Sequence, residues 1–464
     1  MDFSADSRLI RQLLCLICLG CGAGFQTSTE NQRLDSVARY RVSFDGGSEN
    51  ADVEVCFEGA VPPRLQRVGE GAERILQDVR GERGPLRRER TAIYLEDVRE
   101  GECIHYSVSL ASGGRREAMI RSGGEAVITL GLLLWAPTDG TPMTMSFVAA
   151  GRHVSVPWDG EEVPPSVRHF AGNVVITRAP PRTMELDGLR LKVAQLDGPL
   201  MVDAAAVDRW LRSAVEAVRP MGGSFPREAL HLVVVPAGAA DSAILFGLVR
   251  RGGGASILLF PTANANEEEL TRAWVLVHEL SHLTMPRLSG DRWISEGYAT
   301  YMQEFLRLRA GLLTPEVVWR RIATKLRAER VGAGLPLTAE SDIMSRTRTY
   351  SHVYWAGAAL FLEIDIALRR RGSSLFEVIG SAPWSEGERW DGYRCLAAID
   401  EISGAAIAMP LAERYAGLVE IPDLTPLLEE LGVLMDEDGV HFDDEAPGAA
   451  LRQGMNAPSG EASR

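Results

Sequence analysis

The sequence predicts an α+β protein of several domains. Strand patterning fills the first part of the chain, strands and helices mix in the middle, and helical patterning dominates the last part. We expect an antiparallel domain of β-sandwich type over 30–185, a mixed domain over 186–312 and a helical domain over 313–435. Residues 436–464 are first acidic and then rich in Gly, Ser, Asn and Pro, which predicts a flexible tail.

The composition is that of a globular protein. The 464 residues include 45% hydrophobic and 24% charged residues, so a disordered or fibrous chain is excluded. There are 49 Lys and Arg against 63 Asp and Glu, which gives a formal net charge of −14. Because nucleic-acid surfaces need clustered basic charge, this balance argues against nucleic acid as the main partner.

The N-terminus has the pattern of an export signal. Arg8 and Arg11 precede the apolar run 13–19, which is too short to span a bilayer, and small residues follow it. We interpret residues 1–24 as a signal peptide of a protein sent to the bacterial periplasm or cell envelope, with a short hydrophobic tail as the alternative. If the signal is of the lipoprotein type, Cys21 carries the lipid, which would be the only membrane contact.

Three cysteines lie beyond the leader, namely Cys56, Cys103 and Cys395. They form no Cys-X-X-Cys pair, so a zinc site made of thiolates is not expected. An exported protein can pair Cys56 with Cys103, since both lie in strand-like segments. The sequence leaves this open and slightly favours free buried thiols.

Short segments with alternating or continuous apolar residues define the strands of the first domain, with Gly, Pro, Asp and Asn between them. These segments are 40–44, 51–57, 91–95, 103–110, 143–149 and 153–156.

The mixed domain begins with a strand over 189–196 and an amphipathic helix over 204–218. Two apolar strands follow at 230–235 and 256–260. Asn266 and Glu269 form a helix-start signature for a helix that runs to about residue 283.

Asp291 is expected to cap a second helix over 293–309, which Gly311 ends. From residue 315 to about 434 the pattern is mostly helical.

The run His278-Glu-Leu-Ser-His282 carries the clearest chemistry. Residues four apart on a helix lie one turn apart on the same face, so both imidazoles can reach one metal ion. Glu279 is one step round the helix, where it can act on a water at the metal without being a ligand.

The next predicted helix supplies Glu296 as a third ligand. Two histidines, one carboxylate and a water form the open arrangement of catalytic zinc, so we expect one Zn²⁺ per chain. Thr300, one turn later, can orient a ligand or simply pack. The other histidines show no ligand spacing and are expected to be structural; they are His105, His153, His169, His231, His352 and His441.

These residues, followed by Trp293-Ile-Ser-Glu296-Gly-Tyr-Ala-Thr-Tyr301, resemble the gluzincin metallopeptidases. The pattern is similar to aminopeptidase N and closer to the glycyl aminopeptidase-like branch. The resemblance is specific over about 255–357, and it implies a thermolysin-like catalytic domain over 186–312. It also implies that Tyr354, in the run Tyr354-Trp-Ala-Gly357, stabilises the oxyanion.

The chain departs from the aminopeptidase N pattern at one point. The Gly-X-Met-Glu-Asn element that captures a substrate's amino terminus is missing, and residues 250–256 offer no carboxylate in its place. We expect the glycines there to let a peptide pair with an edge strand at 256–260, with Gly253, Gly254, Ala255 and Ser256 as substrate-binding residues. A glycine loop without function is the alternative.

The sequence therefore predicts an exported zinc metallopeptidase that acts on a peptide or protein substrate. Glu279 is the expected general base and Tyr354 the oxyanion donor. The alternative is a catalytically silent peptide-binding or envelope-assembly protein on the same scaffold, and zinc-dependent hydrolysis of a non-peptide substrate is a third interpretation. Similar nitrogen and oxygen sites also accept cobalt or manganese.

Overall fold

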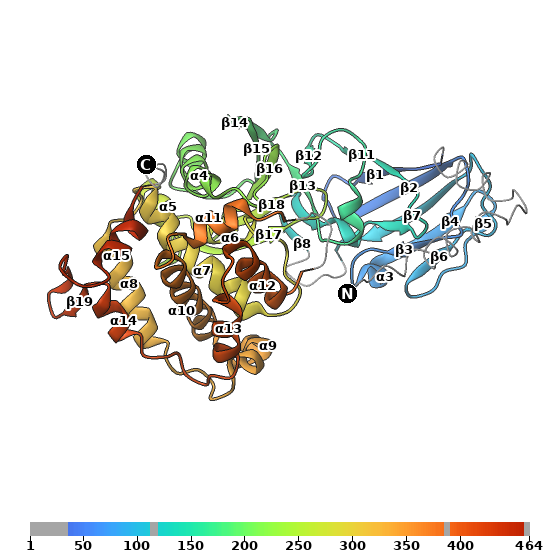
Figure 1. Cartoon of the computed structure of the whole chain (residues 1–464). Coiled ribbons are helices and arrows are strands. Elements are labelled where there is room, and N and C mark those ends of the chain that lie inside the picture. Colours follow the sequence, from blue (N-terminus) through green and yellow to red (C-terminus); the bar gives the residue numbers. More distant parts are fainter. Residues whose placement is uncertain (1–35, 112–118, 385–389, 459–464) are drawn as a thin grey trace, which may run out of the picture.

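Figure 1 shows the computed structural model, which describes residues 36–111, 119–384 and 390–458. A β domain lies at one end of an elongated molecule, and the mixed and helical parts lie together at the other. The α+β multidomain class predicted from the sequence is confirmed. The predicted signal segment 1–24, with Cys21, lies outside the described residues.

The N-terminal domain contains three sheets within the described residues. The largest has the order β11 (Met143–Ala149), β1 (Val37–Phe44), β2 (Asn50–Glu58), β7 (Cys103–Ser109), β4 (Leu76–Gly81) and β5 (Gly84–Pro85). The second has the order β10 (Trp135–Pro137), β3 (Arg64–Arg67) and β6 (Ala92–Tyr94). The third has the order β12 (His153–Ser155), β13 (Asn173–Thr177), β9 (Glu125–Thr129) and β8 (Met119–Ser122). Most pairs are antiparallel as predicted, but β1 and β11 run parallel.

Alternation along the strands builds the core of this domain. Successive side chains of a strand point to opposite faces, so β1 buries Tyr40 and Val42 on one face and exposes the residues between them. Two buried tyrosines tie the large sheet to the second: the Tyr40 hydroxyl donates to the carbonyl of Trp135 at 2.7 Å, and the Tyr106 hydroxyl to that of Leu133 at 2.9 Å.

Cys56 and Cys103 form a disulfide, so the preference for free thiols was wrong. The two residues are directly opposite each other in the register of β2 and β7, with their Cα atoms 4.0 Å apart. Cys395 is buried and has a free thiol.

The mixed domain contains one five-stranded sheet. Its order is β14 (Arg182–Leu186), β15 (Leu189–Gln195), β16 (Ala229–Val234), β18 (Ser256–Pro261) and β17 (Ile244–Arg250). Strand β14 already belongs to this sheet and overlaps the predicted end of the first domain at residue 185. Strand β17 was not predicted, and it places β18 inside the sheet, so the expectation of an edge strand at 256–260 was wrong.

The two faces of this sheet are covered by different parts of the chain. Helix α4 (Ala204–Val218), which has the predicted bounds, lies with the later helices on one face. The other face packs Val233 and Leu258 against Val127 and Val175 of the N-terminal domain. The β domain therefore covers the second face of the five-stranded sheet.

The helix predicted from Asn266 to residue 283 is two helices. The capping box of Asn266 and Glu269 begins α5 (Glu267–Arg272), and Ala273 then takes an extended conformation before α6 (Val275–His282). The buried guanidinium of Arg307 accounts for part of this break, because it donates to the carbonyl of Arg272 at 2.9 Å.

Helix α7 (Arg292–Arg309) follows, but Asp291 does not cap it as predicted. The Asp291 carboxylate accepts instead from the backbone N–H of Gly392. The hydroxyl of Ser341 accepts from the N–H of Trp293 and takes over the cap from a distant helix.

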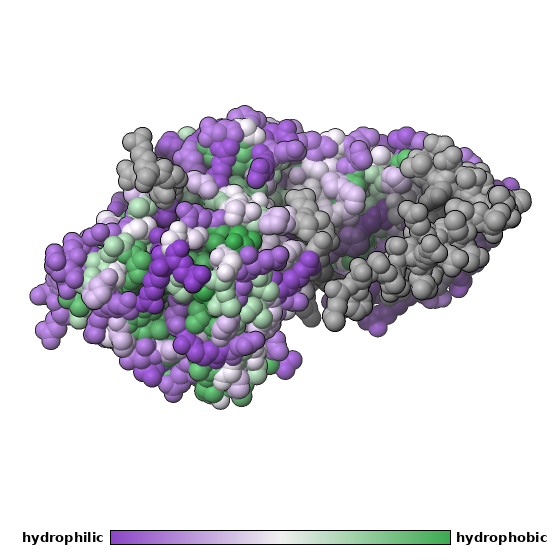
Figure 2. Space-filling model, viewed as in Figure 1, coloured by the Kyte–Doolittle hydropathy of each residue, from purple (hydrophilic) through white to green (hydrophobic). Residues whose placement is uncertain are grey.

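The C-terminal region is mostly helical, as predicted, but its last helix before the hairpin ends at residue 430, a few residues before the predicted end near 434. Its helices are α8 (Pro315–Ala328), α9 (Leu337–Thr347), α10 (Tyr350–Arg369), α11 (Leu375–Ser381), α12 (Gly392–Ser403), α13 (Ala408–Ala416) and α14 (Thr425–Glu430). Among the described residues, one hydrophobic core runs from the mixed sheet through these helices and is continuous across residue 313. On the face in Figure 2, hydrophilic residues cover much of this part, with hydrophobic residues between them.

The predicted flexible tail is folded over its described residues. It contains the hairpin β19 (Val433–Asp436) and β20 (Gly439–Phe442) and the helix α15 (Ala449–Asn456). Buried Arg452 donates to the carbonyls of Leu431 and Gly432, and Met455 joins the main core. The composition of this segment predicted that its loss of conformational entropy on folding would keep it flexible, but these contacts offset that loss. No helix in the described part of the chain is long and apolar enough to cross a membrane.

A buried histidine at the domain contact predicts acid sensitivity. His231 lies between the hydroxyls of Ser155 and Ser256, at 3.0 and 3.3 Å, and burial lowers its pKa to about 3. An unfolded histidine has a pKa of about 6.5, so the unfolded state binds the extra proton between these values and stability falls as pH drops through that window. The free energy of unfolding should lose about 1.4 kcal/mol per pH unit there from this group.

Urea unfolding at several pH values between 4 and 7 measures this. His231→Gln should flatten the dependence, whereas the same change at exposed His153 should leave it as in the wild type. Equal slopes in all three proteins would contradict the account of His231.

Candidate metal centre

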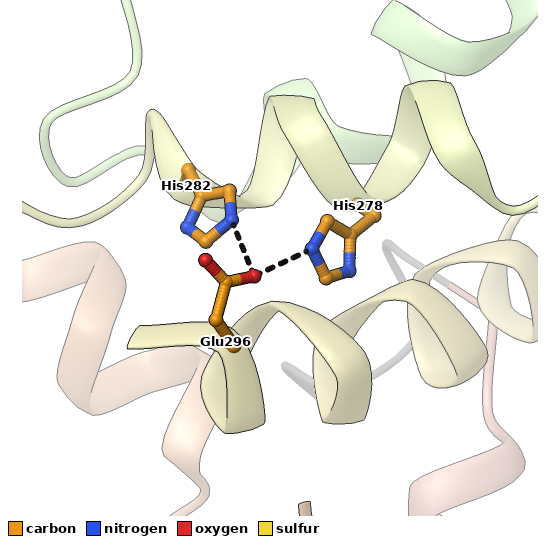
Figure 3. A group of neighbouring side chains, drawn as sticks. All are labelled: His278, His282 and Glu296. Atoms are coloured by element: carbon orange, nitrogen blue, oxygen red, sulfur yellow. Dashed lines mark hydrogen bonds and ion pairs between the residues drawn. The ribbon is translucent and has the colours of Figure 1, made fainter. Parts of the chain in front are cut away.

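Three potential ligands meet between α6 and α7. His278 and His282 lie one turn apart on α6, and Glu296 faces them from the first turns of α7 (Figure 3). An oxygen of Glu296 is 3.2 Å from Nε2 of His278 and 3.5 Å from Nε2 of His282. Each of the three residues offers one possible ligand atom, and these three atoms all lie within 4.8 Å of one another. The structure thus brings together the three ligands predicted from the sequence.

A contact between two glycines holds α7 in this position. A Cβ on Gly297 would come within 2.3 Å of the Cα of Gly357 on α10, and a Cβ on Gly357 within 2.0 Å of the carbonyl oxygen of Trp293. Only glycines permit the two backbones to approach this closely. Because Gly297 follows Glu296 and Gly357 lies one turn after Tyr354, the contact sets both side chains beside the histidines.

Tyr354 lies at the site, where the resemblance placed it. Its ring stacks on that of His278, with centroids 5.9 Å apart and planes inclined by 10°. Burial raises the pKa of Tyr354 above its ordinary value, and the adjacent Glu296 carboxylate raises it further. The phenol therefore keeps its proton at neutral pH and can donate it in a hydrogen bond. Tyr350 is more exposed and contacts Tyr354 edge to face.

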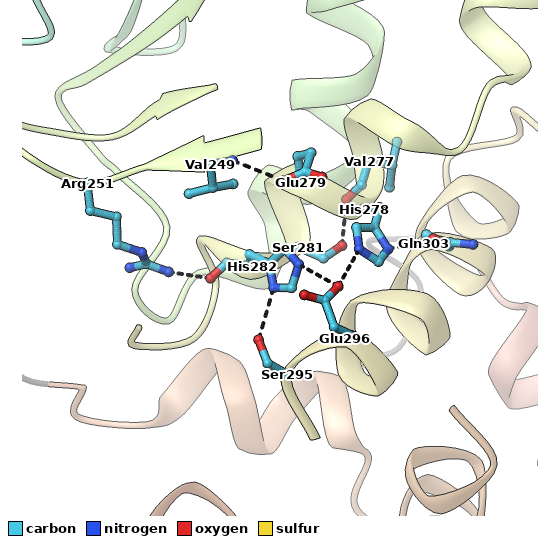
Figure 4. A network of polar contacts seen from close by, with 10 residues as sticks. All are labelled: Val249, Arg251, Val277, His278, Glu279, Ser281, His282, Ser295, Glu296 and Gln303. Atoms are coloured by element: carbon cyan, nitrogen blue, oxygen red, sulfur yellow. Dashed lines mark hydrogen bonds and ion pairs between the residues drawn. The ribbon is translucent and has the colours of Figure 1, made fainter. Parts of the chain in front are cut away.

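The side chain of Glu279 points toward strand β17. Its carboxylate accepts from the backbone N–H of Val249 at 3.1 Å (Figure 4). A Cβ on Gly247 would come within 2.6 Å of Cγ of Glu279, so the strand approaches the side chain closely only because residue 247 is glycine.

The two carboxyls of the site have opposite electrostatic environments. Burial raises the pKa of Glu279 to about 7, with Glu296 adding to the rise and His278 opposing it. Burial also disfavours the ionised form of Glu296, but the two imidazoles outweigh it and hold its pKa below the usual range. Glu296 is thus an anion suited to bind a cation, and Glu279 can gain and lose a proton near neutral pH.

Two neutral side chains contact the Nδ1 atoms of the two histidines, and the sequence did not predict either contact. Oε1 of Gln303 is 2.8 Å from Nδ1 of His278, and the hydroxyl of Ser295 is 3.4 Å from Nδ1 of His282 (Figure 4). Gln303 lies seven residues, or about two turns, after Glu296. That spacing was the signal available in the sequence.

Thr300, the predicted orienting residue, does not contact the ligands. It is buried, lines a cavity of about 10 Å³ together with Trp355 and Glu304, and its hydroxyl has no hydrogen-bond partner among the described residues. Its role is packing.

The glycine segment does not line the site, so the predicted substrate-binding role of Gly253, Gly254, Ala255 and Ser256 was wrong. These residues lie at the contact with the N-terminal domain. A Cβ on Gly253 would meet the ring of Trp158 at 2.4 Å, and one on Gly254 would meet the carbonyl of Pro157 at 2.9 Å. Ala255 is half-buried beside them, and the hydroxyl of Ser256 is buried against His231.

No family model matches the chain, and no curated protein does. Among solved structures, an aminopeptidase N family protein from Idiomarina loihiensis superposes with a TM-score of 0.65, over 88% of this chain and 82% of that chain, at 13% identity. The chain has the fold of that protein. The multidomain architecture expected from the resemblance is therefore confirmed as a fold. Native yeast LTA4 hydrolase covers 88% of this chain and 75% of its own, with a TM-score of 0.48 and 12% identity.

The close approach of β17 to Glu279 gives a stability prediction. Gly247→Ala should lower the free energy of unfolding by about 1–3 kcal/mol, since the added methyl group meets Glu279 and Val275 in a packed contact. Urea unfolding measures the change. Gly238→Ala is the matched control, because a Cβ there meets nothing within 4 Å. If the two variants are equally stable, the contact at Gly247 is looser than the structure shows.

Proposed function

We propose that the protein is an exported zinc-dependent hydrolase that cleaves peptide bonds. The observation that carries this proposal is the convergence of His278, His282 and Glu296 on one point, with Glu279 beside them on the same helix. A pure binding site has no need of a carboxyl group whose pKa is near neutral next to the ligands.

The donor set suits zinc. Two imidazole nitrogens and one carboxylate oxygen leave a position open for water or substrate, which is the pattern of catalytic zinc sites; structural sites are usually closed with sulfur. Cobalt or manganese can occupy such a set in vitro.

When bound, zinc supplies a Lewis acid that polarises a scissile carbonyl and a water molecule. Glu279 takes a proton from the attacking water and returns it to the leaving nitrogen, and a pKa of about 7 suits both transfers. The hydroxyl of Tyr354 donates a hydrogen bond to the oxyanion that forms at the carbonyl.

Strand β17 supports a peptide as the substrate. It is the edge of its sheet within the described strands, and it passes directly over Glu279. An edge strand can pair with an extended peptide backbone. Large apolar side chains are exposed around it: Leu245 and Phe246 on the strand, and Trp274, whose ring meets that of His278 edge to face. We propose that a peptide with apolar side chains lies along β17.

The proposal of export rests on the leader pattern of residues 1–24 and is supported by the disulfide between Cys56 and Cys103. Disulfides persist in oxidising compartments such as the bacterial periplasm.

The first test is metal content and peptide cleavage of the purified protein. We expect about one zinc per chain, much reduced in Glu296→Ala, and cleavage of a peptide library by the wild type. Glu279→Gln should keep the zinc and lose about 10²- to 10⁴-fold in kcat, because only the proton transfer is removed. Zinc binding without any cleavage would favour the silent peptide-binding protein, and absence of zinc after reconstitution would contradict the proposal altogether.

Tyr354→Phe tests the oxyanion role. It should lower kcat by about 10²- to 10³-fold with little change in KM, since the hydrogen bond forms only as the oxyanion develops. Zinc content should stay at the wild-type level. Tyr350→Phe, one turn earlier and more exposed, is the control. An equal loss in both variants would point to a packing effect.

A further inference from the structure

A network of buried polar side chains extends from Nδ1 of His278, the ring nitrogen that faces away from Glu296. Oε1 of Gln303 is 2.8 Å from Nδ1 of His278, and Nε2 of Gln303 donates to Oε1 of Glu304 at 3.0 Å. Glu304 is 2.8 Å from the guanidinium of Arg307 and 3.3 Å from that of Arg321. Gln303, Glu304 and Arg307 are all at most 5% exposed.

The direction of each hydrogen bond follows from the group at the far end. An ionised carboxylate only accepts hydrogen bonds, so the amide of Gln303 must turn its NH₂ toward Glu304. Its carbonyl oxygen then faces His278 and also only accepts, so Nδ1 of His278 must carry the proton. Nε2, on the other side of the ring, is left to face Glu296 and the common point of the three ligands.

Two guanidinium groups, those of Arg307 and Arg321, flank the carboxylate of Glu304. Burial lowers the pKa of Arg307 to about 10, and Glu304 opposes this, so Arg307 remains a cation at neutral pH. The guanidinium of Arg307 also donates to the backbone carbonyl of Gln303 at 2.8 Å and to the backbone carbonyl of Arg272 at 2.9 Å. These bonds fix the guanidinium between α7 and the end of α5. These hydrogen bonds fix Arg307, and with it the end of the polar network that is farthest from His278, within the protein scaffold.

We propose that Glu304 is a positioning residue that acts through Gln303: it fixes the direction of the amide and thereby the tautomer in which His278 presents Nε2 to a metal ion. The inference rests on the proposed zinc site. His282 lacks such control, since its partner Ser295 carries a hydroxyl that can donate or accept at 3.4 Å.

Zinc affinity, measured by competition with a chelator, tests the proposal. Gln303→Met keeps the side-chain length but removes both hydrogen bonds, and it should weaken zinc binding by about 10- to 100-fold. Glu304→Gln keeps the shape but lets the amide of Gln303 turn either way, so it should also weaken binding, by a smaller factor. Thr300→Val, on the same helix and equally buried, should bind zinc as the wild type does.

A charge-swapped pair distinguishes hydrogen-bond direction from packing. In Gln303→Glu alone, two buried carboxylates face each other with no donor between them, so their repulsion should move the side chain at position 303 away from Nδ1 of His278, and zinc binding should weaken. The double variant Gln303→Glu/Glu304→Gln restores a donor between the two positions and an acceptor against Nδ1, so it should bind zinc more tightly than that single variant. This comparison makes the same test should Glu304→Gln not fold. A double variant no better than the single one would overturn the proposal.

NMR of ¹⁵N-histidine-labelled protein gives a readout that is independent of zinc binding and activity. His278 should show one slowly exchanging Nδ1–H signal in the wild type, lost in Gln303→Met and weakened or split in Glu304→Gln. Glu304→Gln with wild-type affinity and an unchanged His278 signal would overturn the role of Glu304. If the wild type binds no zinc, the proposed function fails, and the Nδ1–H signal still decides whether Glu304 sets the tautomer.

Discussion

The contact of α7 with α10 at Gly297 and Gly357 is the constraint on which the site depends. Each glycine stands where a Cβ would strike the opposite backbone. The helices therefore meet at a separation that side chains elsewhere would prevent. Glu296 and Tyr354, which are close to this contact in the sequence, both reach His278: Glu296 contacts Nε2 and Tyr354 stacks on the ring. The spacing of tyrosine and glycine in the sequence is thus a consequence of packing as much as of chemistry.

Around this contact the chain separates two carboxyls by environment. Glu296 faces two imidazoles and remains ionised. Glu279 lies against the backbone of β17, and burial raises its pKa to about 7. Pairs of acids whose pKa values are pushed apart are a common sign of different roles in one reaction. Part of this division follows from α6 itself, since the side chain of Glu279 leaves the helix about 100° away from that of His278, the residue that faces Glu296.

The sequence predicted the meeting of His278, His282 and Glu296 well because their arrangement is local. Four residues of helix place His278 against His282, and a short loop returns Glu296, so neither step needs knowledge of distant contacts. Strand β17 escaped prediction because a bulge exposes Leu245 and Phe246 in succession and removes the alternation that marks a strand.

The remaining errors have the same origin in tertiary structure. The glycines of 252–254 signal a close backbone approach, but the partner is the N-terminal domain and not a substrate. Asp291 has the residue type of a helix cap, yet Ser341 from a distant helix supplies the hydrogen bond. Gln303 was not predicted because an uncharged amide gives no sign of a metal site in the sequence; its role depends on its position against His278 in the folded structure.

The packing of the five-stranded sheet against two domains has a consequence for how the protein can evolve and be engineered. The face formed by Ala194, Val233 and Leu258 is covered by Val127 and Val175, which belong to the N-terminal domain. A mixed domain cut free of the β domain would present that apolar face to water and would tend to aggregate. Recombination that shuffles domains must therefore carry the two together, as a single heritable unit.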